Sequence, residues 1–162
     1  MQKVIWFFSI RGKNVVDIEI SFARSCDVME WMSLIDIVES HFPGLEKDDY
    51  RKILEECIHK KEALCAKAQG KIVGILLFST EHSTLAFIAV HPEYQKCGIA
   101  ADMVKAMIAV FPKGQDIWVT TFREGDAKGE GARALYMRCG FKPDELIIEM
   151  DYPCQKFVLR RE

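Results

Sequence analysis

The residues of this sequence best suited to chemistry lie between Ile88 and Ala101, which read IAVHPEYQKCGIAA. An aliphatic run ends at a proline, and a loop then leads into a segment with helical character. The first turn of a helix exposes N–H groups without intrahelical partners, and the helix dipole adds partial positive charge. Such a turn can bind phosphate or pyrophosphate, and Gly98 would let the anion approach the backbone closely. Gln95 and Lys96 offer further donors, although the same residues also fit an ordinary strand-to-helix connection.

The elements before this stretch begin with a strand and two helices. Alternating apolar and polar residues over 15–22 indicate a half-buried strand, and the first fourteen residues are either its hairpin partner or a loosely attached extension. A helix follows from Val28, with Asp27 and Glu30 as a variant capping box, and it must end by the Pro43 turn. Asp48 can cap a second helix. The apolar face of this second helix is formed by Tyr50, Ile53, Leu54, Cys57 and Ile58.

The remaining elements complete a mixed α/β pattern. Strands are expected over 62–68 and 71–79, joined by a tight turn, and over 84–90, where the continuous apolar run indicates a central strand. A helix over 99–111 and a strand over 117–122 follow. A short helix is expected over 132–139 with Gly140 as its C-cap, and two last strands over 146–150 and 155–159.

Two segments resemble sequence elements of one enzyme family. The loop from Gln95 to Ala100 is similar to the Arg/Gln-x-x-Gly-x-Gly/Ala loop of the GNAT superfamily of acyl-CoA-dependent N-acyltransferases, and 88–92 resembles its aliphatic-x-Val-x-Pro strand ending. Downstream, 132–141 (ARALYMRCGF) resembles the family's Ala-x-x-Leu/Ala-Tyr-x-x-x-Gly-Phe element. The resemblance implies a GNAT-like α/β fold. Its mixed, mostly antiparallel central sheet would splay between strands four and five and be flanked by about four helices.

The resemblance also implies how acetyl-CoA, the co-substrate, would be bound. Backbone N–H groups of the loop and the first turn of the helix would hold its pyrophosphate, and the end of the 84–90 strand would bind the pantetheine arm. A backbone N–H near Ala89 or Val90 would polarise the thioester carbonyl. The residues implied to bind acetyl-CoA are Ile88, Ala89, Val90, Gln95, Lys96, Cys97, Gly98, Ile99, Ala100 and Ala101.

The catalytic residue that the resemblance implies is Tyr136, whose hydroxyl would donate to the departing CoA sulfur. A tyrosine has an ordinary pKa of about 10, so its hydroxyl is protonated at neutral pH and can act as the acid. The alternative is that Tyr136 is a core aromatic on an amphipathic helix.

Two departures from the family pattern concern the rest of the site. The family often has asparagine seven residues before this tyrosine, whereas Gly129 stands here. No carboxylate lies in the 84–90 strand, where some members place a general base, so no base is predicted and a water chain is the default.

The amine acceptor would be bound by the first two helices and the last strands. Side chains suited to that groove are Trp31, Phe42, Pro43 and Tyr50, with Glu46, Asp48 or Asp49 attracting a cation. The alternative, which the sequence favours, assigns Trp31 and Tyr50 to the core and the acids to the helix start.

Composition limits the class of protein. The 162 residues fit one domain, 1–162, and 22 basic against 24 acidic residues give a net charge of −2, which argues against nucleic-acid binding by bulk charge. No apolar run is long enough to cross a membrane, and we expect no signal peptide and no membrane partner. The six scattered cysteines form no metal motif, so we expect no metal, reduced thiols and a cytoplasmic location.

The function expected is N-acetyl transfer from acetyl-CoA to a primary amine by direct attack in a ternary complex. The acceptor would be a small molecule or a peptide, and homodimerisation stays open because relatives often dimerise. One alternative is a non-catalytic acyl-CoA-binding sensor or interaction module. The other is an unrelated α/β protein that binds a phosphate-containing ligand.

Overall fold

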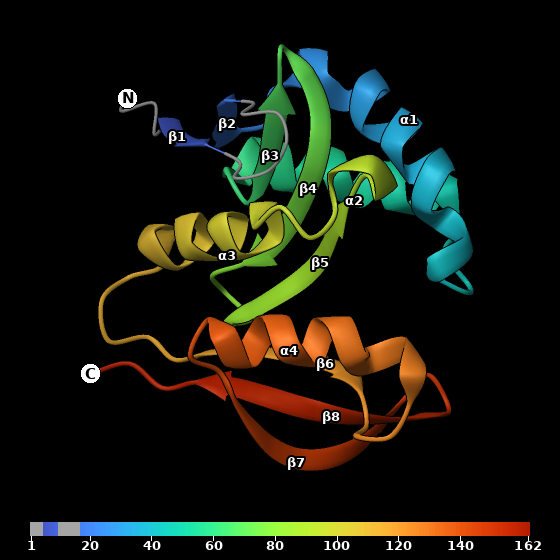
Figure 1. The fold of residues 1–162 in the computed structure, drawn as a ribbon, viewed down its shortest axis with the longest axis vertical. Coiled ribbons are helices and arrows are strands. Elements are labelled where there is room, and N and C mark those ends of the chain that lie inside the picture. The colour runs from blue at the N-terminus through green and yellow to red at the C-terminus, as the bar shows by residue number, and fades with distance from the viewer. Residues whose placement is uncertain (1–4, 10–16) are drawn as a thin grey trace.

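The computed structural model describes residues 5–9 and 17–162, which form one continuous eight-stranded sheet with helices on both faces (Figure 1). The strand order is β1-β2-β3-β4-β5-β6-β8-β7, and every neighbouring pair is antiparallel except β5 and β6. The strands are β1 (Ile5–Ser9), β2 (Asp17–Phe22), β3 (Ala63–Ala68), β4 (Lys71–Ser79), β5 (Thr84–Val90), β6 (Ile117–Phe122), β7 (Lys142–Glu149) and β8 (Tyr152–Leu159). The α-helices are α1 (Val28–Val38), α2 (Lys47–Lys60), α3 (Ile99–Val110) and α4 (Glu130–Arg138).

Two hydrophobic cores hold the helices on the sheet. The larger core packs α3 and α4 on one face, around side chains such as Met103, Val104 and Phe157, which are fully buried. The second core packs α1 and α2 on the other face, around Trp31 and Leu54. Helices α3 and α4 therefore cover one face of the sheet, and α1 and α2 cover the other.

The sheet opens between β5 and β6. These parallel strands have a single register pair, Thr84 with Trp118, at their amino-terminal ends, and they diverge toward their carboxyl ends (Figure 1). The closed end is fastened by the Trp118 N–H, which donates to the Ser83 carbonyl at 2.8 Å, and by the Thr84 hydroxyl, which donates to the Trp118 carbonyl at 3.0 Å. Counted from β2, β5 and β6 are the fourth and fifth strands, so the expected splay and the mixed, mostly antiparallel sheet with four α-helices are confirmed.

The order of elements predicted from the sequence is confirmed, and their bounds differ by a few residues. The helix α4 starts two residues before the predicted Ala132, and β7 and β8 extend further toward their amino-terminal ends than expected. The open question about the first fourteen residues is answered for residues 5–9, which pair with β2 as β1. Residues 11–14, whose sequence Arg-Gly-Lys-Asn predicts a turn, lie outside the described residues.

The predictions for the starts of α1 and α2 were wrong in detail. The Asp27 carboxylate accepts from the Arg24 N–H at 2.8 Å, and Glu30 accepts from the Ile72 N–H on β4 at 3.0 Å, so the two do not form a capping box. Glu46, rather than Asp48, caps α2, because its carboxylate accepts from the Asp48 N–H. Both carboxylates of the expected capping box thus serve contacts outside α1.

The buried apolar face of α2 contains fewer residues than the sequence predicted. Tyr50 and Leu54 are buried, but Ile53 is 52% exposed. Tyr50 and Leu54, together with the half-buried Cys57 and Ile58, hold the helix on the sheet.

Candidate active site

The connection from β5 to α3 forms a compact loop closed by its own hydrogen bonds. Residues Pro92–Tyr94 make one 3-10 turn, and the Nδ1 atom of His91 accepts from the Glu93 N–H at 3.1 Å. The side-chain amide of Gln95 donates to the carbonyl of Val90 at 3.2 Å. The loop therefore folds back on the end of β5 and places the start of α3 beside it.

Gly98, directly before α3, has a left-handed backbone conformation that determines where the first turn of the helix points. Its φ is +84°, and a Cβ built there would have no atom within 4 Å, so the space in front of the helix start is open. No side chain caps this end, which leaves the N–H groups of the first turn, 99–101, available to an anion. Lys96, with φ of +62°, makes the other left-handed step that turns the backbone into this position.

The backbone amides of β5 divide between β4 and the opening. The His91 N–H donates to the Val73 carbonyl at 2.8 Å, and the same register pairs Ala89 with Ile75. Because partners alternate along an antiparallel pair, the Ala89 amide points to β4, and those of Ile88 and Val90 point toward the opening. Of the two amides expected to polarise a carbonyl, only that of Val90 thus has the required direction.

Tyr136 lies on α4 within the larger core. It is 4% exposed, and its ring packs against Phe141 and Phe157 with centroids 5.9 and 6.0 Å away. Its hydroxyl makes no hydrogen bond within residues 5–9 and 17–162. Burial, and next the nearby Cys139, raise the pKa of Tyr136 well above its ordinary value. A buried phenol that stays protonated and has no partner is able to donate to a ligand atom.

Residues 31–141 match a family model described as Acetyltransferase (GNAT) family. The chain belongs to the GNAT acetyltransferase family. No curated protein matches the chain.

Several crystal structures share this GNAT fold at low identity. An acetyltransferase of the GNAT family from Bacillus cereus ATCC 10987 is 19% identical, with a TM-score of 0.72 over 90% of this chain and 98% of that one. The ribosomal-protein-S18-alanine N-acetyltransferase from Escherichia coli is also 19% identical, with a TM-score of 0.69 over 90% and 94%. A GNAT acetyltransferase from Streptococcus agalactiae 2603 is 14% identical, with a TM-score of 0.70 over 94% and 99%. At these identities the likeness concerns the fold.

The glycine that departs from the GNAT pattern is required by packing. Gly129 is buried, and a Cβ there would lie 2.8 Å from the Cβ of Phe122 and 3.2 Å from its carbonyl oxygen. The guanidinium of Arg133 donates to this same carbonyl at 3.1 Å and to the Gln155 side chain at 2.7 Å. The start of α4 is therefore held against β6 too closely for an asparagine at position 129. Sequence reasoning missed Arg133, which only its position among apolar residues could have suggested.

The residues suggested for the acceptor groove divide between core and surface. The Trp31 indole donates to the Tyr50 hydroxyl at 3.0 Å, and both side chains are buried. Phe42 is half-buried and stacks on Phe87 of β5 at 4.5 Å, and Pro43 is exposed. Trp31 and Tyr50 thus belong to the core, as the sequence favoured, and Phe42 with Phe87 remains as an aromatic wall on the α1 and α2 face.

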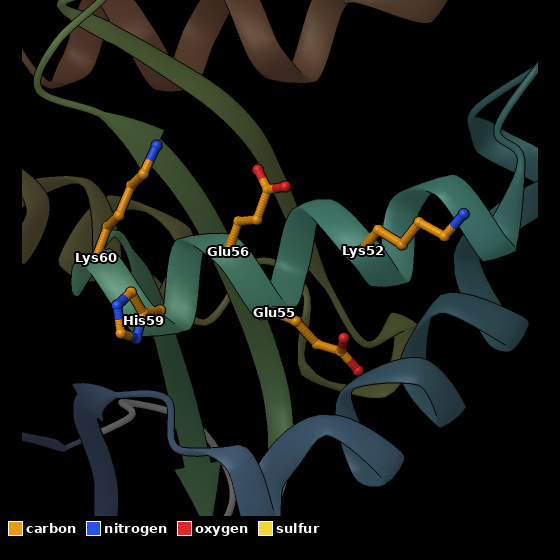
Figure 2. Close-up of a pocket in the computed structure, with 5 residues that line it drawn as sticks. All are labelled: Lys52, Glu55, Glu56, His59 and Lys60. Carbon is orange, nitrogen blue, oxygen red and sulfur yellow. The ribbon is translucent and has the colours of Figure 1, made fainter.

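Two surface depressions lie away from this opening. One, of about 430 Å³, is lined by residues of α2 alone, and Figure 2 shows the Lys60 and Glu56 side chains leaving the helix on one side and Glu55 on the other. The other, of about 370 Å³, lies beside the closed end of β5 and β6, where Arg160 is paired with Asp116 at 3.4 Å. Neither lies at the open end between β5 and β6.

Other classes of site find no support in the described part of the chain. Within residues 5–9 and 17–162, no group of His, Cys, Asp and Glu side chains is arranged to hold a metal ion. No helix there is long and apolar enough to cross a membrane. All six cysteines are free thiols, and burial raises the pKa of Cys57, Cys65, Cys139 and Cys154.

Proposed function

We propose that this GNAT protein transfers an acetyl group from acetyl-CoA to a primary amine by direct attack in a ternary complex. The observation that carries the proposal is the opening between β5 and β6, which are paired only at Thr84 and Trp118. It leaves the Ile88 and Val90 amides directed at a space that an extended ligand could enter.

The surroundings of the opening fit acetyl-CoA. The uncapped start of α3 would take the pyrophosphate through the N–H groups of 97–101, with Gln95 and Lys96 beside it. The pantetheine arm would add to β5 as an extra strand along 88–90, for which Gln95 must release the Val90 carbonyl. Bound there, acetyl-CoA supplies an activated acetyl group as a thioester.

The chain's own groups would then act on each end of the reacting bond. The Val90 N–H would stabilise the negative charge that develops on the carbonyl oxygen. Tyr136 would give its proton to the sulfur that leaves. The two groups come from different elements, β5 and α4, whose side chains contribute to the same core, in which Tyr136 is buried and against which Ile88 and Val90 pack.

The free thiols support a reducing compartment, and we therefore assign the protein to the cytoplasm. We also propose a single acetyltransferase domain over 1–162. The acceptor would be a small-molecule or peptide amine. A peptide N-terminus is included because one structural neighbour is an N-acetyltransferase of an alanine in ribosomal protein S18.

The test is a screen for amine-dependent release of CoA, detected as free thiol. Acetyl-CoA would be combined with spermidine, glucosamine, lysine and a short peptide with a free N-terminus, one at a time. Thermal unfolding would follow uptake separately, because acetyl-CoA at 100 times its Kd would raise the free energy of unfolding by about 2.7 kcal/mol. Uptake without turnover of any amine would favour the acyl-CoA-binding module instead. No uptake at all would refute both.

A further inference from the structure

The transfer leaves one proton without an acceptor. A primary amine is mostly an ammonium ion at neutral pH, and it must lose a proton before it can attack a carbonyl. The residues of β5 include no carboxylate. A side chain that takes this proton directly would therefore have to come from another element beside the opening.

Two buried or ordered carboxylates near β5 and β6 are already engaged. Glu62 accepts from both the N–H and the hydroxyl of Thr80, at 2.6 and 3.0 Å, near the closed end of the opening. Asp126 uses one oxygen for the Tyr152 hydroxyl at 2.8 Å and the other for the Lys128 N–H at 3.0 Å. Glu62, which uses a single oxygen for both contacts, is 8% exposed, and both oxygens of Asp126 are engaged, so neither is placed to bind an amine at the open end.

Glu149 is different, because its side chain is exposed at the end of β7 and only one of its oxygens is engaged. Its Oε2 accepts from the Thr120 hydroxyl at 2.6 Å, and no hydrogen bond or ion pair joins Oε1 to the described residues. The contact is not local, since Glu149 ends β7 and Thr120 lies in β6. One oxygen is fixed and the other is available.

Thr120 faces the opening from the side opposite Tyr136. Alternate residues of β6, Ile117 and Val119, enter the core that contains α4 and Tyr136, so Thr120 faces the other side of the sheet. Trp118 pairs with Thr84, and therefore Thr120 lies across the opening from the exposed Ala86. Ile88 lies two residues beyond Ala86 on β5, about 7 Å further toward the open end.

The tip of the β7–β8 hairpin that carries Glu149 is tied down at several points. The Arg123 guanidinium donates to the carbonyls of Cys154 and Ile147, both at 3.1 Å. Tyr152 stacks edge-on against Phe122 with centroids 5.2 Å apart and donates to Asp126. The position of Glu149 is thus fixed relative to the open end of β6.

We propose that Glu149, oriented by Thr120, binds the acceptor's ammonium group and takes its proton, which makes Glu149 a second catalytic residue. This inference rests on the proposed acetyl transfer. The amine and the leaving sulfur would approach from opposite faces of the sheet, the first at Glu149 and the second at Tyr136.

The step balances without a further reactant. The ammonium gives one proton to the Glu149 carboxylate, and the amine nitrogen forms the new C–N bond to the carbonyl carbon. The C–S bond breaks, its electron pair stays on sulfur, and Tyr136 supplies the proton that makes the thiol. After the C–N bond has formed, the nitrogen still carries one proton too many, and it loses this proton to water as the amide forms. Glu149 also releases its proton to water and Tyr136 regains one, so two protons are released and one is taken up, a net release of one proton per acetyl group transferred.

The experiment compares Glu149→Gln with the wild type and with Glu145→Gln on the same strand, whose carboxylate lies 3.9 Å from Lys156. The probes are the four amines of the screen. At pH 7 we expect kcat/KM of Glu149→Gln to fall by about 10²–10⁴-fold. The deficit should shrink by about tenfold per pH unit toward pH 9, because free amine needs no base. Glu145→Gln should match the wild type, and the Kd for acetyl-CoA should be unchanged in both variants.

The remaining outcomes separate the two proposals. Thr120→Val should show a smaller deficit with the same pH dependence, and Thr120→Ser should restore activity. Turnover by Glu149→Gln equal to the wild type, or a deficit that is constant with pH, overturns the role of Glu149 and leaves acetyl transfer intact. Uptake of acetyl-CoA with no turnover of any amine by the wild type overturns acetyl transfer and, with it, this role.

Discussion

The hydroxyl of Tyr136 has no partner among the described residues, in a position where buried polar groups normally have one. The ring itself is well packed between two phenylalanines. Because burial raises its pKa, the hydroxyl stays protonated through neutral and mildly alkaline pH. The side chain thus contributes to packing through its ring and is available for chemistry through its oxygen.

Replacing Tyr136 by phenylalanine should separate these two contributions. We expect kcat to fall by about 10²–10⁴-fold, with the Kd for acetyl-CoA and the melting temperature nearly unchanged, because no hydrogen bond to the protein is lost. Steady-state kinetics, calorimetry and thermal unfolding provide the three measurements. The raised pKa also predicts that wild-type kcat does not fall between pH 8 and 10 through ionisation of Tyr136. Unchanged turnover in the variant would remove Tyr136 from the mechanism.

Gly129 and Gly131 provide a matched pair for testing why the usual asparagine is missing. Gly129→Ala should lower the free energy of unfolding by about 1–3 kcal/mol, because the new methyl group meets Phe122. Gly131→Ala, inside α4 with no atom within 4 Å, should be neutral or stabilising by up to about 1 kcal/mol. Urea denaturation measures both. Equal stabilities would show that packing does not exclude a side chain at position 129.

At the scale of elements, the sequence pattern predicted the helices and strands because each has its own periodicity and end signals. The helix α3 follows a glycine and carries apolar residues at helical spacing, and β5 is a continuous apolar run. The way in which the elements are placed relative to one another is not contained in these local patterns. That β5 and β6 pair at one position and then separate follows from long-range packing, and only the family resemblance suggested it.

The start of α3 can be tested with a second pair of glycines. Gly98 and Gly44 both have φ of +84° and open space around a built Cβ, so alanine should strain the backbone by a similar amount, about 1–2 kcal/mol. Only Gly98→Ala should weaken acetyl-CoA binding, by tenfold or more, since its methyl group would stand where the pyrophosphate approaches. Calorimetry gives the two Kd values. A similar loss in Gly44→Ala would mean that strain alone is responsible.

At the scale of the whole molecule, one ion pair joins the start of α1 to β3. The Lys67 ammonium lies 2.8 Å from the Asp27 carboxylate, and both side chains are largely buried. Burial opposes ionisation of Asp27, but the hydrogen bonds from Lys67 and Arg24, with the charge of Lys67, outweigh it and lower the pKa of Asp27. The pair therefore stabilises the fold only while Asp27 is ionised.

This pair predicts how stability depends on pH. Because the pKa of Asp27 is lower in the folded state, its contribution is complete above about pH 5 and is lost as the pH falls through the folded pKa. Asp27→Asn should cost about 3 kcal/mol at pH 7, by leaving Lys67 unpaired, and should flatten the acid part of the profile. Chemical denaturation from pH 3 to 7 measures this. Asp36→Asn, which breaks an exposed pair with Lys47, should change little, and an equal loss there would contradict the explanation.

The candidate site could be predicted from the sequence only where its residues are close together in the chain. The loop from Gln95 to Gly98 and the helix with Tyr136 form local motifs, and the resemblance assigned them. Thr120 and Glu149 are 29 residues apart and meet through the folding of a hairpin. The capping predictions at Asp27 and Glu30 were wrong for a similar reason, since distant strands bind these carboxylates.

The separation of β5 from β6 also gives the protein two sheet edges in its interior. Unpaired strand edges at the rim of a sheet attract other polypeptides and favour aggregation. These inner edges are fastened at Thr84 and Trp118, with helices packed on the two faces of the sheet. A narrow, extended molecule with amide groups can hydrogen-bond to such an edge. A folded protein that presents a strand of its own would instead contact the helices that cover the two faces of the sheet. The arrangement that leaves β5 open to an extended ligand thus also protects the protein from edge-to-edge aggregation with other copies of itself.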